Sequence, residues 1–282
     1  MTTAVAVPGA LAVPEAASRA DVLRGTYAGL AEALRPLVRL EAVPRVGGER
    51  VTGERLVRDA ALREQLVDAA ERRIADTYGV TPRRDVAAMD ALHQYAFYAA
   101  VAMSGPWFLA HRVPWIGRDG FAHDGASDTL TVAPSHLLCL PGDPVAALPG
   151  VRVVADEERL RAALREAVAD HLGPVLEAFR PLLRRGTRAV WGLAADELTE
   201  GIWYVGRVTG QERRAVAAAD VLLPGGTPPF VGAAGFRPCG AAAAAGEGDA
   251  AGEATRTRIN CCLWYTVTPQ RPCSTCPRRG IS

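Results

Sequence analysis

Four cysteines within sixteen residues constrain this chain more than any other feature of its sequence. They form an adjacent pair, Cys261 and Cys262, followed after ten residues by Cys273 and, two residues later, by Cys276. Two intervening residues allow both sulfurs of a Cys-x-x-Cys pair to turn onto one metal ion. The spacing therefore predicts a metal or redox centre close to the C-terminus of the chain.

The adjacent pair favours a centre with two metal ions over a single ion. Neighbouring side chains in an extended chain point in opposite directions. Cys261 and Cys262 can therefore serve one centre only where the backbone bends, or where each sulfur reaches a different part of a wider centre. A [2Fe–2S] cluster offers that width, so we expect this cofactor on Cys261, Cys262, Cys273 and Cys276. A structural zinc site with four cysteine ligands and a disulfide or thiol switch are the alternatives.

The charge of the tail supports a cluster. Residues 254–282 contain five arginines and no Asp or Glu. A [2Fe–2S] cluster with four thiolate ligands is an anion, and nearby cations would stabilise its reduced form. Over the whole chain, 32 basic and 31 acidic residues leave a formal net charge of +1. This balance gives no reason to expect a nucleic-acid partner.

The sequence also bears on location. The first residues, Met1 to Pro14, are small and apolar but lack the basic start of a secretory signal. The most apolar stretch, Tyr95 to Leu109, is shorter than the ~20 residues that span a bilayer. We therefore expect no transmembrane segment and a cytoplasmic protein, with a peripheral position at the inner face of the membrane as the alternative. Structural disulfides are disfavoured in the cytoplasm.

Hydrophobic periodicity predicts a mainly α-helical fold with a small β element, an α+β arrangement in which a helical body precedes a small iron–sulfur module. We expect a disordered leader over 1–15, the helical body over 16–223, a Pro/Gly/Ala-rich linker over 224–253 and the cluster module over 254–282.

Start signals and breakers locate the individual elements. Helical patterns begin at Ser18, Thr52, Thr81-Pro82, Asp156, Thr187 and Gln211. We expect the third helix to stop at Gly105-Pro106 and Pro174 to kink or split the fourth. Two β-like runs, Thr129 to Ala133 and Val151 to Ala155, predict a small hairpin or a sheet edge.

The tail resembles a known signature. Arg256-Thr-Arg258-Ile-Asn-Cys261-Cys262-Leu-Trp264-Tyr265, followed by Cys273-Ser-Thr-Cys276-Pro277, is similar to the C-terminal signature of the FhuF-like ferric siderophore reductases. Upstream, Ala189-Val-Trp191-Gly192-Leu-Ala resembles the Trp-Gly helix segment of that family. Two features depart from the family pattern: Leu193 follows Gly192 where the family often has Asn, and residues 240–252 look like an Ala/Gly insertion.

The resemblance implies a cytoplasmic oxidoreductase that reduces the iron of an imported ferric siderophore by one electron and releases Fe(II) during iron acquisition. The four cysteines would hold the [2Fe–2S] cluster, and no catalytic residue beyond the cluster is implied. Oxygen-rich chelators hold Fe(III) more tightly than Fe(II), so one electron weakens the complex. The sequence has no Gly-x-Gly-x-x-Gly after a strand, so we expect a separate donor, a ferredoxin or a flavoprotein reductase.

Two other functions remain open from the residues alone. The chain could be an iron–sulfur electron carrier or sensor that binds another protein, or a structural zinc-binding protein without reductase activity.

The sequence also predicts where several residues outside the signature lie. Cys139 is expected to be a small buried side chain, and Cys239 a free thiol in a loop. His93 is expected on the core face of a helix, and the five histidines show no metal-ligand spacing. Large aromatic side chains should mainly fill the core, namely Trp107, Trp115, Trp191 and Trp203. Trp264 and Tyr265 should either shield the cluster from water or pack the tail onto the body.

Overall fold

The computed structural model describes residues 18–48, 50–238, 254–271, 273 and 275–277. The helices are α1 (Arg19–Leu34), α2 (Gly53–Arg58), α3 (Ala60–Tyr78), α4 (Arg84–Ala110), α5 (Glu157–Leu183), α6 (Thr187–Val208), α7 (Glu212–Leu222) and the short 3-10 helices η1 (Arg118–Gly120) and η2 (Trp264–Thr266). The strands are β1 (Arg39–Ala42), β2 (Arg112–Trp115), β3 (Phe121–Asp124), β4 (Thr129–Val132), β5 (His136–Cys139), β6 (Val151–Val153), β7 (Phe236–Pro238) and β8 (Ala254–Arg256). The predicted mainly helical fold with a small β element is confirmed.

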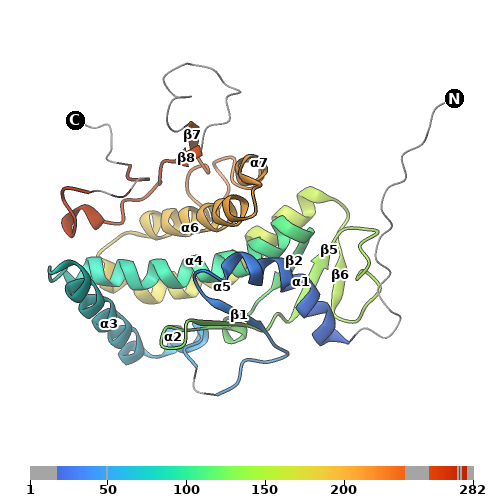
Figure 1. Ribbon diagram of the computed structural model, residues 1–282, viewed down its shortest axis with the longest axis horizontal. Coiled ribbons are helices and arrows are strands. Elements are labelled where there is room, and N and C mark those ends of the chain that lie inside the picture. The colour runs from blue at the N-terminus through green and yellow to red at the C-terminus, as the bar shows by residue number, and fades with distance from the viewer. Residues whose placement is uncertain (1–17, 49, 239–253, 272, 274, 278–282) are drawn as a thin grey trace.

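Helix α4 forms the centre of the body, with α1, α3, α5 and α6 packed around it (Figure 1). It is apolar on nearly every side, as expected for a helix with neighbours all round. Small side chains let those neighbours approach closely, among them Ala96, Ala99, Ala100 and Ala102, all fully buried. Even so, no helix in the described part of the chain is long and apolar enough to cross a membrane.

Most helix starts lie where the capping residues place them. Ser18 caps α1 and forms a reciprocal capping box with Asp21. Thr52 caps α2, and Gly79 ends α3 in the left-handed conformation with φ 67°. The pattern from Thr52 to Tyr78 is two helices rather than one, because Asp59 adopts extended backbone and caps α3 through its own side chain.

The predicted end of α4 at Gly105-Pro106 is wrong. The helix starts at Arg84 and continues through Pro106 to Ala110. Gly105 is a packing residue here, because a Cβ at this position would lie 2.5 Å from Cδ1 of Leu30 on α1. Pro106 removes one backbone donor, but the next turn buries two large aromatic rings that favour its continuation. Helix α5 likewise runs on through Pro174 without being split.

The two β-like runs lie in different sheets, so the predicted hairpin is wrong, whereas the alternative of a sheet edge holds for β6. Strand β4 pairs with β1 in parallel and with β3 antiparallel, whereas β6 pairs in parallel with β5. The parallel partner of β4 comes from a segment about ninety positions earlier, where Arg39 stands opposite Thr129. Such long-range pairing leaves no turn signal in the sequence.

The first part of the predicted linker is packed structure. Phe230 and Ala234 are buried, and the amide of Ala234 donates to the carbonyl of Leu223 at the end of α7. Strand β7 then pairs with β8, which leads into the cysteine segment above α6 (Figure 1). Apolar contacts therefore hold residues 224–238 on the body. The predicted leader over 1–15 and residues 239–253 of the linker lie outside the described residues.

Candidate functional site

The structure brings two of the four signature cysteines together. The sulfurs of Cys262 and Cys273 lie 3.9 Å apart. Cys276 is buried, and its amide donates to the carbonyl of Cys273, which closes the Cys-x-x-Cys turn. Cys261 is half-buried and packs on a small apolar cluster that includes Ile74 of α3 and Val86 of α4. The adjacent cysteines thus have different surroundings.

Thiols are the ligands that the expected iron–sulfur cluster requires, and the two sulfurs of Cys262 and Cys273 lie at a suitable distance from each other. Two sulfurs bound tetrahedrally to one metal ion at about 2.3 Å lie about 3.8 Å apart, close to the observed separation between Cys262 and Cys273. Among the described residues, no group of three or more His, Cys, Asp or Glu side chains is close enough to hold a metal ion. The structure therefore shows one pair of thiols, Cys262 and Cys273, at a separation that would suit two ligands of one metal ion.

The hydrogen bond between the thiols of Cys262 and Cys273 shifts their pKa values in opposite directions. This hydrogen bond, the backbone amide of Trp264 and the positive charges of Arg258 and His93 together lower the pKa of Cys262 to about 6, against the opposing effect of burial. The same hydrogen bond raises the pKa of Cys273. Cys262 is thus the better thiolate, which is the form that binds metals.

A carboxylate on α6 fixes the chain that enters the cysteine segment. Asp196 is buried, and its Oδ1 accepts hydrogen bonds from Nη1 of Arg256 at 3.0 Å and from the amide of Ile259 at 2.9 Å. Its Oδ2 accepts the amide of Asn260 at 2.9 Å. Burial raises the pKa of Asp196, although the neighbouring arginines lower it. Glu200, one turn further along α6, accepts Nε of Arg256 at 2.9 Å.

A second carboxylate connects the tail to α4. Glu197 is fully buried, and its Oε1 lies 2.6 Å from Nδ1 of His93 and 3.1 Å from Nη2 of Arg258. Burial alone would raise the pKa of Glu197, but His93 and Arg258 lower it. Burial would lower the pKa of His93, but the Glu197 carboxylate outweighs this effect and raises it. His93, Glu197 and Arg258 thus form a compact charged group beside Cys262.

These contacts change the interpretation of the basic tail. Two of its five arginines, Arg256 and Arg258, are buried and paired with carboxylates of α6. Asp196, Glu197 and Glu200 of α6 provide the carboxylate partners that the tail itself lacks. Only part of the positive charge expected from the sequence is therefore left to act on an anionic cluster.

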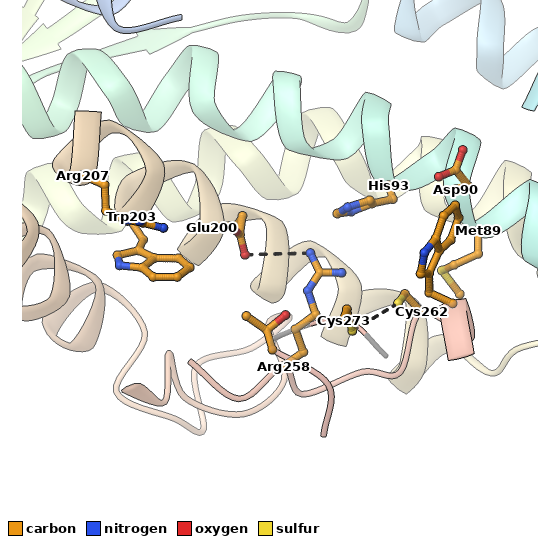
Figure 2. Close-up of a pocket in the computed structure, with 11 residues that line it drawn as sticks. Met89, Asp90, His93, Glu200, Trp203, Arg207, Arg258, Cys262 and Cys273 are labelled. Carbon is orange, nitrogen blue, oxygen red and sulfur yellow. Dashed lines mark hydrogen bonds and ion pairs between the residues drawn. The ribbon is translucent and has the colours of Figure 1, made fainter. Parts of the chain in front are cut away.

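A pocket of about 400 Å³ opens beside the paired cysteines. Figure 2 shows Cys262 and Cys273 at one end of it and Trp203 with Arg207 at the other. Arg207 lies over the Trp203 ring, 5.2 Å from its centroid. The lining combines aromatic, apolar and charged side chains: Met89, Asp90, His93, Glu200, Trp203, Arg207, Arg258, Cys262, Trp264, Cys273 and Thr275. A volume of this size can hold a small organic ligand or part of a larger one.

Residues outside the signature divide between core and pocket. Cys139 is fully buried, as predicted, whereas Cys239 lies outside the described residues. Trp107 is also buried in the core, but Trp203 lines the pocket as well as being buried. His93 was expected to be a core residue and instead stands at the pocket wall.

The expected packing of Trp264 against the body is observed, whereas its shielding of a cluster stays a prediction. Trp264 lines the pocket beside Cys262, and its ring packs edge-on against Tyr78 of α3 with the centroids 5.3 Å apart. Both Trp264 and Tyr265 pack on the apolar cluster that contacts Cys261. The aromatic pair therefore anchors the tail on the body next to Cys261.

Sequence reasoning missed the carboxylates of α6. Asp196, Glu197 and Glu200 lie in a stretch of α6 whose other residues are mainly apolar and buried, such as Leu193, Leu198 and Ile202. Acidic side chains at such positions are rarely buried unless they are paired. That contrast is the signal that could have identified partners for the tail arginines.

No model of a protein family matches the chain, and no curated protein matches it.

Proposed function

We propose that this chain is a cytoplasmic ferric-siderophore reductase that holds a [2Fe–2S] cluster on Cys261, Cys262, Cys273 and Cys276. The observation that carries the proposal is the pair of thiols, Cys262 and Cys273, at metal-sharing distance beside a pocket. When bound, such a cluster supplies electrons one at a time. The resemblance of the tail to the FhuF-like signature supports the same function.

The residues around the cysteines have defined tasks in this proposal. Arg258 and His93 place positive charge next to Cys262, which favours its thiolate. Trp264 covers the cysteines on one side and limits the access of water. The pocket brings a chelate within a short distance of the thiols, and outer-sphere electron transfer needs no bond-making side chain. The electron reduces Fe(III) of the chelate to Fe(II), and the chelator then holds the iron less tightly.

Partners follow from this chemistry. A ferric siderophore is the substrate, and a separate ferredoxin or flavoprotein reductase is the electron donor. A peripheral position at the inner face of the membrane, where imported chelates arrive, is compatible with the proposal.

A structural zinc site is the second candidate. The separation of 3.9 Å between the two sulfurs suits any tetrahedral ion with thiolate ligands, zinc included. An iron–sulfur carrier or sensor is the third candidate. A carrier would pass its electron to another protein instead of to a ferric chelate, and a sensor would bind another protein according to the state of its cluster.

The direct test is a single-turnover reduction assay. Protein purified without oxygen is reduced, freed of excess reductant, and mixed with ferric hydroxamate, catecholate and citrate chelates in the presence of a ferrous trap. We expect about one Fe(II) per chain with at least one chelate, loss of this activity in Cys273→Ser, and its retention in the control Cys139→Ser. A protein that yields no Fe(II) with any chelate, yet exchanges electrons with a ferredoxin, would be a carrier.

A further inference from the structure

The carboxylate of Asp196 makes an unusual set of contacts for a residue in the middle of a helix. It is 2% exposed, and it accepts hydrogen bonds from two consecutive backbone amides of the tail, those of Ile259 and Asn260. Arg256 brackets the same residue, since Nη1 donates to Oδ1 at 3.0 Å and Nη2 donates to the Asp196 carbonyl at 2.7 Å. Four hydrogen bonds thus join one position of α6 to a short segment of the tail.

Two consecutive amides that donate to one carboxylate show that the backbone is not extended at this point. In an extended strand, successive N–H groups point to opposite sides. Ile259 and Asn260 both donate to Asp196, at 2.9 Å each, so the chain must bend at this point. The bend immediately precedes Cys261 and Cys262. It sets the direction in which the chain enters the cysteine pair.

The other α6 carboxylates do not contact this stretch of backbone. Glu200 binds Arg256 and Arg258 only through their guanidinium groups. Glu197 binds the side chains of His93 and Arg258. Asp196 and Glu200 therefore share the charge-pairing role with Arg256, but only Asp196 holds the amides that precede the cysteine pair.

We propose that Asp196 is a positioning residue: it fixes the bend before Cys261 and Cys262 and thereby holds the Cys262 thiol next to Cys273, at the separation that two ligands of one metal centre need. The inference rests on the proposed function for the identity of that centre. In the described residues, Asp196 makes no hydrogen bond to a cysteine thiol. It acts through the backbone amides of Ile259 and Asn260.

The first test compares Asp196→Asn with Glu200→Gln by hydrogen exchange in the full-length metal-free protein. Both variants remove one charge that faces Arg256, but only Asp196→Asn replaces an acceptor oxygen at the amides with an NH₂ group. We expect the amides of Ile259 and Asn260 to exchange at least about tenfold faster in Asp196→Asn and at the wild-type rate in Glu200→Gln. Equal exchange in Asp196→Asn and the wild type would overturn the inference.

The second test uses the loaded protein and detects the geometry of the centre. We expect Asp196→Asn to retain less iron and sulfide per chain and to show shifted g values in the EPR spectrum of its reduced cluster, with Glu200→Gln keeping the wild-type g values. Unchanged g values and full occupancy in Asp196→Asn would also overturn the inference. Should Asp196→Asn fail to fold, Asp196→Glu is measured instead, because it keeps the charge while one added methylene displaces the carboxylate from the amides.

A failure of the proposed function is distinguishable from a failure of this inference. If the wild type takes up no iron–sulfur cluster, the proposed function fails. The positioning role is then decided by titrating the metal-free proteins with Co(II) and recording the thiolate-to-cobalt absorption. Weaker binding by Asp196→Asn than by Glu200→Gln supports the role, and equal binding refutes it.

Discussion

The sulfur of Cys262 lies 3.9 Å from the sulfur of Cys273, eleven positions further along the chain. This contact joins the adjacent cysteine pair to the Cys-x-x-Cys pair. It depends on the bend before Cys261 and on the short helix η2, which begins after Leu263 adopts the left-handed conformation with φ 64°. The separation is that of two thiolates on one tetrahedral metal ion.

Replacing either sulfur of this pair should therefore remove the metal centre. We expect Cys262→Ser and Cys273→Ser to lose most of their bound metal, because a hydroxyl is a poor ligand for iron or zinc beside thiolates. Cys139→Ser is the matched control, because Cys139 is buried in β5, outside the cysteine segment. This variant should leave the metal content unchanged. Metal and sulfide analysis of anaerobically purified proteins measures the effect. A fully loaded Cys262→Ser protein would remove Cys262 from the ligand set.

The ion pair between Arg258 and Glu197 should contribute to the stability of the fold. Arg258→Gln leaves the fully buried Glu197 carboxylate with His93 as its remaining charged partner. Loss of one member of a buried pair typically costs about 3 kcal/mol of unfolding free energy. We expect a drop of that order in chemical denaturation of the metal-free protein. Arg271→Gln, an exposed site in the same tail, should change the unfolding free energy by less than about 0.5 kcal/mol; equal midpoints for the two variants would contradict the role of this pair.

His171 should make the fold sensitive to acid. It is fully buried, its Nε2 lies 2.8 Å from the Tyr95 hydroxyl, and its Nδ1 lies 3.0 Å from the Ile116 carbonyl. Burial lowers the pKa of His171 to about 4. Between pH 4 and pH 6.5 the unfolded chain therefore binds a proton that the folded chain does not, so stability falls as the pH is lowered through this window.

The shift in the pKa of His171 corresponds to about 3 kcal/mol of unfolding free energy, nearly all lost by pH 4. Urea denaturation at a series of pH values measures this loss. His171→Gln should remove that part of the pH dependence, whereas the exposed control His111→Gln should keep it. A His171→Gln protein with the wild-type pH profile would show that other groups cause the acid sensitivity.

Trp264 should protect the metal centre from solvent. Its ring lines the pocket beside Cys262 and packs against Tyr78. Trp264→Ala would open this side of the cysteines to water and oxygen, so we expect its cluster to bleach severalfold faster in air. Tyr265→Phe, which keeps an aromatic ring on the same segment, serves as the control. Identical bleaching half-lives for Trp264→Ala and the wild type would exclude a shielding role.

The sequence predicts the local features of this fold well. Ser18 and Thr52 act as helix caps because capping depends on residues close in sequence. The stop at Pro106 was wrong because burial of the following turn outweighs one lost hydrogen bond. The pairing of β1 with β4 could not be predicted, since it joins distant segments and depends on the tertiary fold.

The same division holds for the site. The spacing of the cysteines identifies them as candidate ligands, and Cys262 and Cys273 do lie together. The charged contacts of Arg256 and Arg258 were missed because their partners on α6 lie about sixty positions earlier. A composition count showed a basic tail, but only the three-dimensional arrangement shows which charges are compensated.

EPR spectroscopy of the protein purified without oxygen and reduced with dithionite detects the proposed [2Fe–2S] cluster itself. We expect a red-brown protein with about two iron and two sulfide per chain, and an S = 1/2 signal that integrates to about one spin per chain. A colourless, EPR-silent protein with one zinc ion per chain would contradict it.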